Sequence, residues 1–89
     1  DGFSTLGRDN FSVTCQTTSG TSASFQVYLR GLASQAWILD TEFGSAGTKV
    51  VNAGDTFKYS NTCDGSDAIM VVVSAYSGAA TADAWAEVW

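Results

Sequence analysis

The sequence contains no histidine and only two cysteines. Without histidine, the chain lacks the usual general base that activates a serine or cysteine nucleophile. It also lacks the imidazole ligand of zinc sites, and two cysteines alone do not complete a structural zinc site. The glycines are isolated, so no phosphate-binding loop is present. A pair of carboxylates could hydrolyse a glycoside, but a small sheet has little room for a cleft around them. These absences predict a protein that is not an enzyme and that uses no cofactor.

Basic residues are also scarce. Four Lys and Arg residues face nine Asp and Glu residues, which gives a net charge of −5. The four bases, Arg8, Arg30, Lys49 and Lys58, are scattered singly, so no basic patch is available to bind phosphates. The longest apolar run, Ala68–Val73, is too short to span a bilayer as a helix. We therefore predict an acidic protein with no nucleic-acid partner and no membrane span.

The composition is that of a small folded protein. The chain has 89 residues, of which 45% are hydrophobic and 15% are charged. This length suits one domain rather than two, so residues 1–89 are predicted to form a single β domain with a thin core. Proline is absent, so glycine, asparagine, aspartate and serine must form the turns. The chain begins with Asp1 rather than Met, which favours a cleaved leader.

The two cysteines, Cys15 and Cys63, predict a disulfide. A cysteine pair in a small, lysine-poor chain rich in serine and threonine is typical of an oxidising compartment. Closing a loop of this length would stabilise a thin core by about 4 kcal/mol in the chain-entropy model. The alternative is two buried free thiols in a cytosolic protein. We expect the bond, and with it a secreted, extracellular protein.

Alternation of apolar and polar residues dominates the chain and predicts strands. The expected strands are residues 10–17, 22–30, 36–43, 48–52, 56–61, 68–76 and 81–89. The most apolar of them, Ala68–Tyr76, is expected to be a central strand with both faces buried. About seven short strands predict an all-β fold: a small antiparallel β-sandwich, immunoglobulin-like, or a small barrel.

The order Cys15, Trp37, Cys63 also occurs in immunoglobulin domains. Those domains have a tyrosine two residues before the second cysteine, and this sequence has Asn61 there. The order alone therefore does not identify an immunoglobulin domain.

The last expected strand, Thr81–Trp89, has two different faces. One face carries Ala82, Ala84, Ala86 and Val88, and the other carries Asp83, Trp85, Glu87 and Trp89. Burying the tryptophans would gain more apolar area, but it would also bury two carboxylates. This competition favours a partly wet face, with both tryptophans on the surface or under a partner. The alternative places both tryptophans in the core.

Exposed tryptophans flanked by acids suit a sugar, because the indole stacks on the ring and the carboxylates accept hydrogen bonds from its hydroxyls. Tyr28, on the polar face of the second strand, is a further candidate contact. We therefore predict a non-enzymatic module that binds a glycan or a cell-surface ligand. The predicted contacts are Trp85, Trp89, Asp83, Glu87 and Tyr28.

A second hypothesis is self-assembly into a pilus, coat or matrix. Residues 1–9 form a glycine-broken segment with two apolar anchors, Phe3 and Leu6, that could add to an open sheet edge of another copy. A secreted toxin or protein inhibitor is a third hypothesis, with candidate loops at Gly31–Gln35 and Gly44–Gly47.

Oxygen-bearing side chains crowd the loop beside Cys63. They are Asn61, Asp64, Ser66 and Asp67, and such ligands could hold calcium. Their spacing lacks the alternating ligands and the distal glutamate of an EF-hand. We therefore predict an acidic turn and no metal site.

Overall fold

A computed structural model describes residues 3–4, 8–31, 36–63 and 66–89. These residues form eight strands: β1 (Phe3–Ser4), β2 (Asn10–Ser19), β3 (Ser22–Arg30), β4 (Ile38–Leu39), β5 (Thr48–Asn52), β6 (Thr56–Thr62), β7 (Ala68–Ser77) and β8 (Thr81–Val88). Within the described ranges, no helix is long and apolar enough to cross a membrane.

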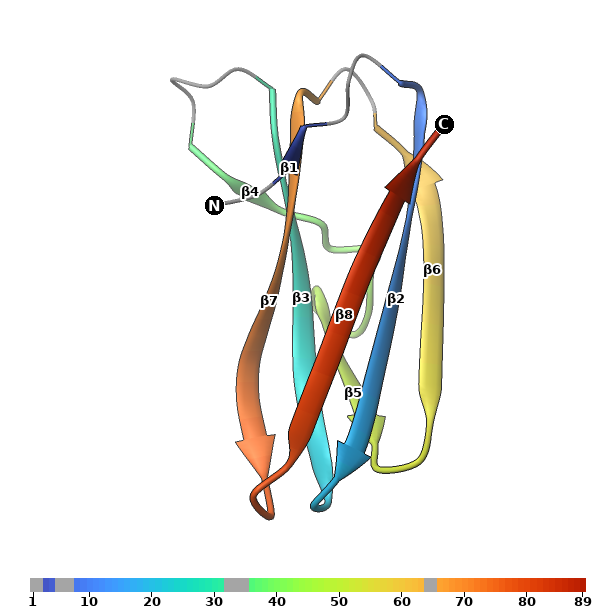
Figure 1. The fold of residues 1–89 in the computed structure, drawn as a ribbon. Helices are drawn as coiled ribbons and strands as arrows, with labels where there is room; N and C mark the ends of the chain where they lie inside the picture. Colours follow the sequence, from blue (N-terminus) through green and yellow to red (C-terminus); the bar gives the residue numbers. More distant parts are fainter. Residues whose placement is uncertain (1–2, 5–7, 32–35, 64–65) are drawn as a thin grey trace.

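The strands form two antiparallel sheets that face each other (Figure 1). One sheet has the order β1-β7-β3-β4, and β5 also pairs with β3. The other has the order β6-β2-β8. Among the described residues, one isolated bridge between Thr17 and Ala53 links the sheets, so the sandwich does not close into a barrel. The prediction of an all-β antiparallel sandwich is confirmed.

The centre of each sheet is a strand with strict alternation in its sequence. The inward side chains of β2 and β3 are almost completely buried, at 0–1% exposure: Phe11, Val13, Cys15, Ala23, Phe25 and Val27. The turn at Gly20, between these strands, packs against the turn at Gly78, between β7 and β8. Both glycines have positive φ angles, 75° and 70°, which glycine adopts without steric cost.

The prediction that Ala68–Tyr76 is a central strand with both faces buried is correct only at one end: β7 lies between β1 and β3 in the strand order, but its described partners flank it on both sides only at Ala68 and Ile69. One side of β7 pairs with β3, whereas β1 pairs with the other side only at Ala68 and Ile69. The core-facing Val71 and the outward Val72 are both only partly buried. An apolar run shows that side chains can be buried, but it does not specify how many strands lie beside it.

The expected strand at residues 36–43 is also largely wrong. Only Ile38–Leu39 pairs with β3. The next residue, Asp40, is buried, and its carboxylate accepts a hydrogen bond from the backbone N–H of Glu42 at 3.0 Å. Such a bond from an aspartate to the residue two positions later forms a turn, which ends the strand.

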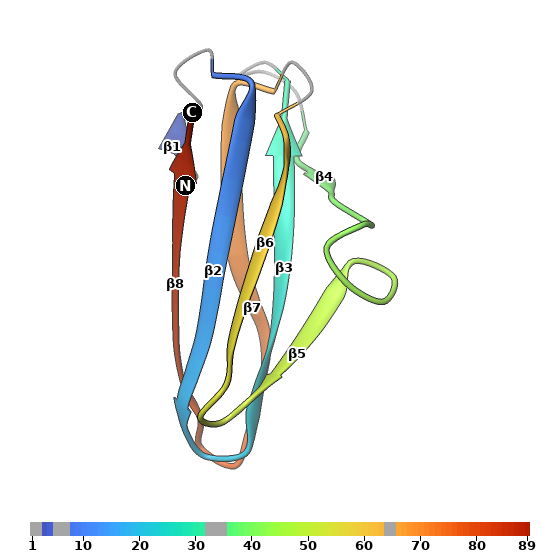
Figure 2. The same cartoon turned by 90° about the vertical axis from the view of Figure 1, so that its right-hand side faces the viewer.

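Phe43 closes one flank of the sandwich. Its ring is 2% exposed and packs edge-on against Phe57 and Tyr59, with ring centroids 5.6 and 5.3 Å away. Figure 2 shows the chain between β4 and β5 on this flank, with β1 and β8 on the opposite flank. The segment from 40 to 47, which joins β4 to β5 of the same sheet, therefore contributes an aromatic ring that packs between the two sheets.

Cys15 and Cys63 are buried free thiols, so the predicted disulfide is wrong. Cys63 follows Thr62, which pairs with Asn10, whereas Cys15 lies five residues farther along β2. Five residues of an extended strand span roughly 17 Å. A disulfide requires Cα atoms within about 7 Å. Both cysteines instead fill the core as small apolar side chains.

We expect both thiols to be unreactive in the native protein. Burial raises the pKa of the Cys15 thiol to about 12, and it also raises the pKa of Cys63. Because the thiolate is the reactive form, a thiol reagent should react only after denaturation, and then with both cysteines. Titration of unreduced protein in denaturant measures this number. A result of no free thiols would show that the chain forms a disulfide after all.

Candidate functional site

The outer face of the β6-β2-β8 sheet carries the tryptophans of the last strand. On β8, Ala82, Ala86 and Val88 pack against the core. Trp85 and Trp89 point the other way and are 48% and 54% exposed. The side chains that face the core here are small, and the two tryptophans remain outside.

Cross-strand pairing surrounds the tryptophans with polar residues. Trp85 lies opposite Thr14, which lies opposite Lys58. The backbone of Trp89 exchanges two hydrogen bonds with that of Asn10, each 3.0 Å long. We call this surface the tryptophan face; it comprises Asp83, Trp85, Glu87 and Trp89 of β8 and its C-terminal end, Asn10, Ser12, Thr14 and Gln16 of β2, and Thr56, Lys58, Ser60 and Thr62 of β6.

The tryptophan face surrounds its two indole rings with hydrogen-bonding groups. Asp83 and Glu87 flank Trp85 on the same face of the strand and offer carboxylate acceptors. Ser12 is buried, but Thr14, Thr56, Ser60 and Thr62 offer hydroxyl groups that both donate and accept. Trp85 and Trp89 are four residues apart, so their Cα atoms are separated by roughly 13 Å along the strand.

Tyr28 does not belong to this face. It lies on β3, on the outer face of the other sheet, and its hydroxyl donates a hydrogen bond to Gln26 Oε1 at 3.0 Å. The amide of Gln26 in turn donates to Thr48 Oγ1 at 3.2 Å. Because packed sheets are about 10 Å apart, Tyr28 and Trp85 cannot contact one compact ligand.

The predicted assembly anchors are only partly described. Phe3 lies in β1, with its backbone opposite Ile69 of the same chain, and Leu6 lies outside the described residues. Residues 32–35, part of a predicted inhibitor loop, also lie outside them. The structure thus places β1 on the edge of its own sheet.

The predicted acidic loop is likewise incomplete, because Asp64 lies outside the described residues. Asp67 faces Arg30, with 3.6 Å between the carboxylate oxygen and Nε. The guanidinium of Arg30 also lies over the ring of Trp37, 4.5 Å from its centroid. Asp67 therefore contacts a cation of the protein itself.

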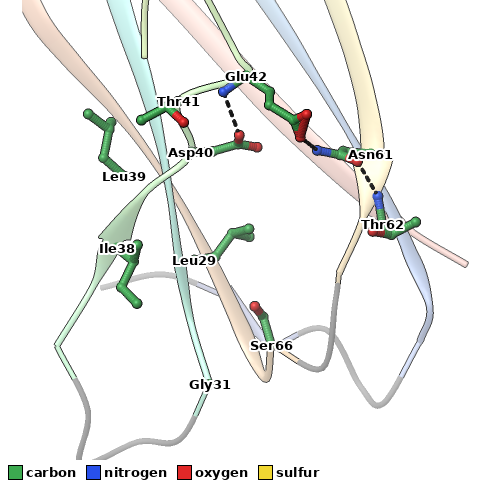
Figure 3. A pocket seen from close by; sticks show the side chains of 10 residues that line it. All are labelled: Leu29, Gly31, Ile38, Leu39, Asp40, Thr41, Glu42, Asn61, Thr62 and Ser66. Atoms are coloured by element: carbon green, nitrogen blue, oxygen red, sulfur yellow. Dashed lines mark hydrogen bonds between the residues drawn. The ribbon is translucent and has the colours of Figure 1, made fainter. Parts of the chain in front are cut away.

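A separate, concave site, which sequence reasoning missed, lies beside β4. Figure 3 shows this pocket of about 460 Å³ between the segment after β4 and the end of β6. Its wall includes Leu29, Ile38, Leu39, Asp40, Glu42 and Asn61. No local sequence pattern could reveal this pocket, because its walls come from segments far apart in the chain.

A hydrogen-bond network fixes the polar wall of this pocket. Tyr59 donates to Asp40 Oδ2 at 2.9 Å, and the amide of Asn61 donates to Tyr59 Oη at 2.8 Å and to Glu42 Oε1 at 3.1 Å. Burial, with a further contribution from Asp40, raises the pKa of Tyr59 to about 12. Tyr59 therefore remains a donor at neutral pH. Both oxygens of Asp40 are bonded within the chain, so this network holds the segment after β4 against β6.

Comparisons of the chain with protein-family models, with curated proteins and with solved structures find no match. Because a sandwich fold can host many unrelated functions, the function has to be argued from the sites themselves.

Proposed function

We propose that the protein is an extracellular, non-enzymatic module that binds a glycan through the tryptophan face. One observation carries this proposal: Trp85 and Trp89 are about half exposed on one face of β8 and its C-terminal end, with Trp85 between Asp83 and Glu87 and Trp89 two residues after Glu87. Tryptophan is highly buried in most proteins. A strand that directs its alanines inward and its tryptophans outward forgoes apolar burial, and a ligand that covers the rings would recover it.

The residues around the rings match the surface of a sugar. An indole ring offers a flat apolar surface to the C–H groups of a pyranose. Asp83 and Glu87 can accept hydrogen bonds from the sugar hydroxyls, and Thr14 can donate or accept. Because the tryptophans are roughly 13 Å apart, a ligand that contacts both is an oligosaccharide or a polymer lying along β8.

The chemistry of the face also limits the ligand and its location. Two carboxylates adjoin the rings, and the protein carries a net charge of −5, which disfavours anionic glycans. A cell-surface protein is the second candidate ligand, because exposed tryptophans also serve as anchors in protein interfaces. Because Cys15 and Cys63 are free thiols, the extracellular location rests on composition alone, which is rich in serine and threonine and poor in lysine.

Trp85→Ala tests the proposal. We expect the variant to lose about 1–3 kcal/mol of binding free energy, or roughly 5- to 150-fold in affinity. Its free energy of unfolding should change by less than about 1 kcal/mol, because the ring is already half exposed. A glycan array identifies the ligand, calorimetric titration gives the affinity, and urea unfolding gives the stability.

Tyr28→Ala is the matched control, since it removes an aromatic ring from the other sheet and should leave the affinity unchanged. Two results would contradict the proposal. One is a stability loss of about 3–5 kcal/mol for Trp85→Ala, which is typical of a core aromatic. The other is a Trp85→Ala variant that binds every glycan bound by the native protein with unchanged affinity.

A further inference from the structure

Among the described residues, the side of β7 opposite β3 is unpaired over most of its length. In Figure 1, β1 lies beside only one end of β7. Among the described residues, no strand pairs with Met70–Ser77 on that side. The N–H and C=O groups of a free edge can pair with another chain.

The core is less well covered on this flank than on the other. Beside β6, Phe43 fills the space between the sheets. Beside β7 and β8, the core-facing Val71 and Val73 are only partly buried, Ala84 is exposed, and Tyr76 is 60% exposed. Within the described residues, no large buried side chain fills the space between the sheets on this flank as Phe43 does on the other.

The other long edge strands carry charges that oppose strand pairing. Lys49 lies on β5, Lys58 lies on β6, and Asp83 and Glu87 lie on β8. Met70–Ser77 contains no charged residue and no proline. Charged side chains are a usual protection of an edge, and Met70–Ser77 lacks them. A β-bulge, which β7 has at Ser74, protects an edge only where it twists the strand away from a partner.

A bulge in β7 makes this edge complementary to itself. Val71 pairs with the buried Val27, so it faces the core. Tyr76 pairs with the buried Ala23 and also faces the core side. In a regular strand, residues five apart face opposite sides, but the register shift at Ser74 brings these two to the same side.

We propose that Met70–Ser77 pairs antiparallel with the same residues of a second copy, forming a two-fold symmetric dimer. β1 occupies one end of this edge and the turn to β8 follows the other. The whole free stretch therefore pairs only when Met70 of one copy lies opposite Ser77 of the second copy.

This register places matching residues opposite each other. Val71 of one copy lies opposite Tyr76 of the second copy, and Val72 lies opposite Ala75, each pair on one face. Pairs of an aromatic and a β-branched residue stabilise antiparallel sheets. The ring of Tyr76 would then cover the partly exposed Val71, once in each half of the dimer. This self-complementarity identifies a second copy as the occupant.

Ala75→Lys tests the proposal in the full chain. Ala75 is exposed, so the variant should fold, which far-UV circular dichroism checks. Sedimentation velocity from about 1 μM to 1 mM should show a monomer–dimer equilibrium for the native protein. Ala75→Lys should raise its dissociation constant at least tenfold, and Tyr76→Ala should raise it as well. Ala36→Lys changes the charge equally at another exposed position and should leave the constant unchanged.

The outcomes separate clearly. A native protein that remains monomeric at the highest concentration overturns the proposal. A dimer that Ala75→Lys and Tyr76→Ala leave unchanged forms elsewhere on the surface, which also overturns it. If Ala75→Lys does not fold, Tyr76→Ala decides alone, because its side chain is mostly exposed in the monomer. Added salt should favour the dimer, since it screens the repulsion between two copies that each carry a charge of −5.

Discussion

Replacement of Phe43 by alanine is expected to lower the free energy of unfolding by about 3–5 kcal/mol. The ring is almost fully buried and makes edge-on contacts with Phe57 and Tyr59. The variant loses the transfer free energy of the ring, leaves a cavity and loses two aromatic pairs. Phe43 also anchors the segment from 40 to 47, so this segment should loosen in the variant.

Urea unfolding followed by tryptophan fluorescence measures this loss. Phe43→Leu is the control, because it loses the two aromatic pairs but keeps a large apolar side chain, so it should cost less than Phe43→Ala. The leucine variant also gives a value if the alanine variant does not fold. An alanine variant that is as stable as the native protein would show that this flank is not part of the core.

Gly20→Ala is expected to destabilise the protein by about 2–5 kcal/mol. Gly20 has a φ of 75°, a conformation that costs an alanine roughly 1–2 kcal/mol. A Cβ atom at this position would lie 2.5 Å from the carbonyl oxygen of Gly78 and 2.6 Å from the Cα of Ala80. Both atoms are backbone, so one of the two turns must move, at a cost of about 1–3 kcal/mol.

Gly54→Ala separates these two effects. Gly54 has a φ of 89°, and no atom lies within 4 Å of a Cβ built on it. This variant should therefore show the conformational strain alone, about 1–2 kcal/mol. Equal losses for Gly20→Ala and Gly54→Ala, measured by urea unfolding, would show that the turns at Gly20 and Gly78 do not pack together.

The sequence predicts where the strands of this protein lie better than it predicts which strands pair with each other. The alternation in Phe11, Val13 and Cys15 identifies both the strand β2 and its buried face, because the alternation of side chains along a strand is a local property. The same rule assigned Trp85 and Trp89 to one side of the last strand. Whether that side faces solvent depends on the gain from burying two tryptophans against the cost of burying Asp83 and Glu87. Both quantities can be compared from the sequence alone.

The remaining features depend on contacts between distant residues. Tyr59 and Asp40 are 19 positions apart, and no local pattern connects them. The disulfide prediction rested on composition, but the register of β2 and β6 separates Cys15 from Cys63. Most of one side of β7 lacks a described partner because β1 pairs with it only at Ala68 and Ile69, which the apolar sequence of β7 does not specify.

The order of strands in the β6-β2-β8 sheet also has a kinetic consequence. β2 comes early in the chain, yet both strands beside it, β6 and β8, come late. During synthesis, β2 therefore has neither neighbour until most of the chain has been made, and the tryptophan face forms last. Sheets built from such distant segments fold slowly, because the chain must close long loops before their contacts form. Until then, both backbone edges of β2 are unpaired and its apolar side chains are uncovered, so β2 is open to contacts with other chains.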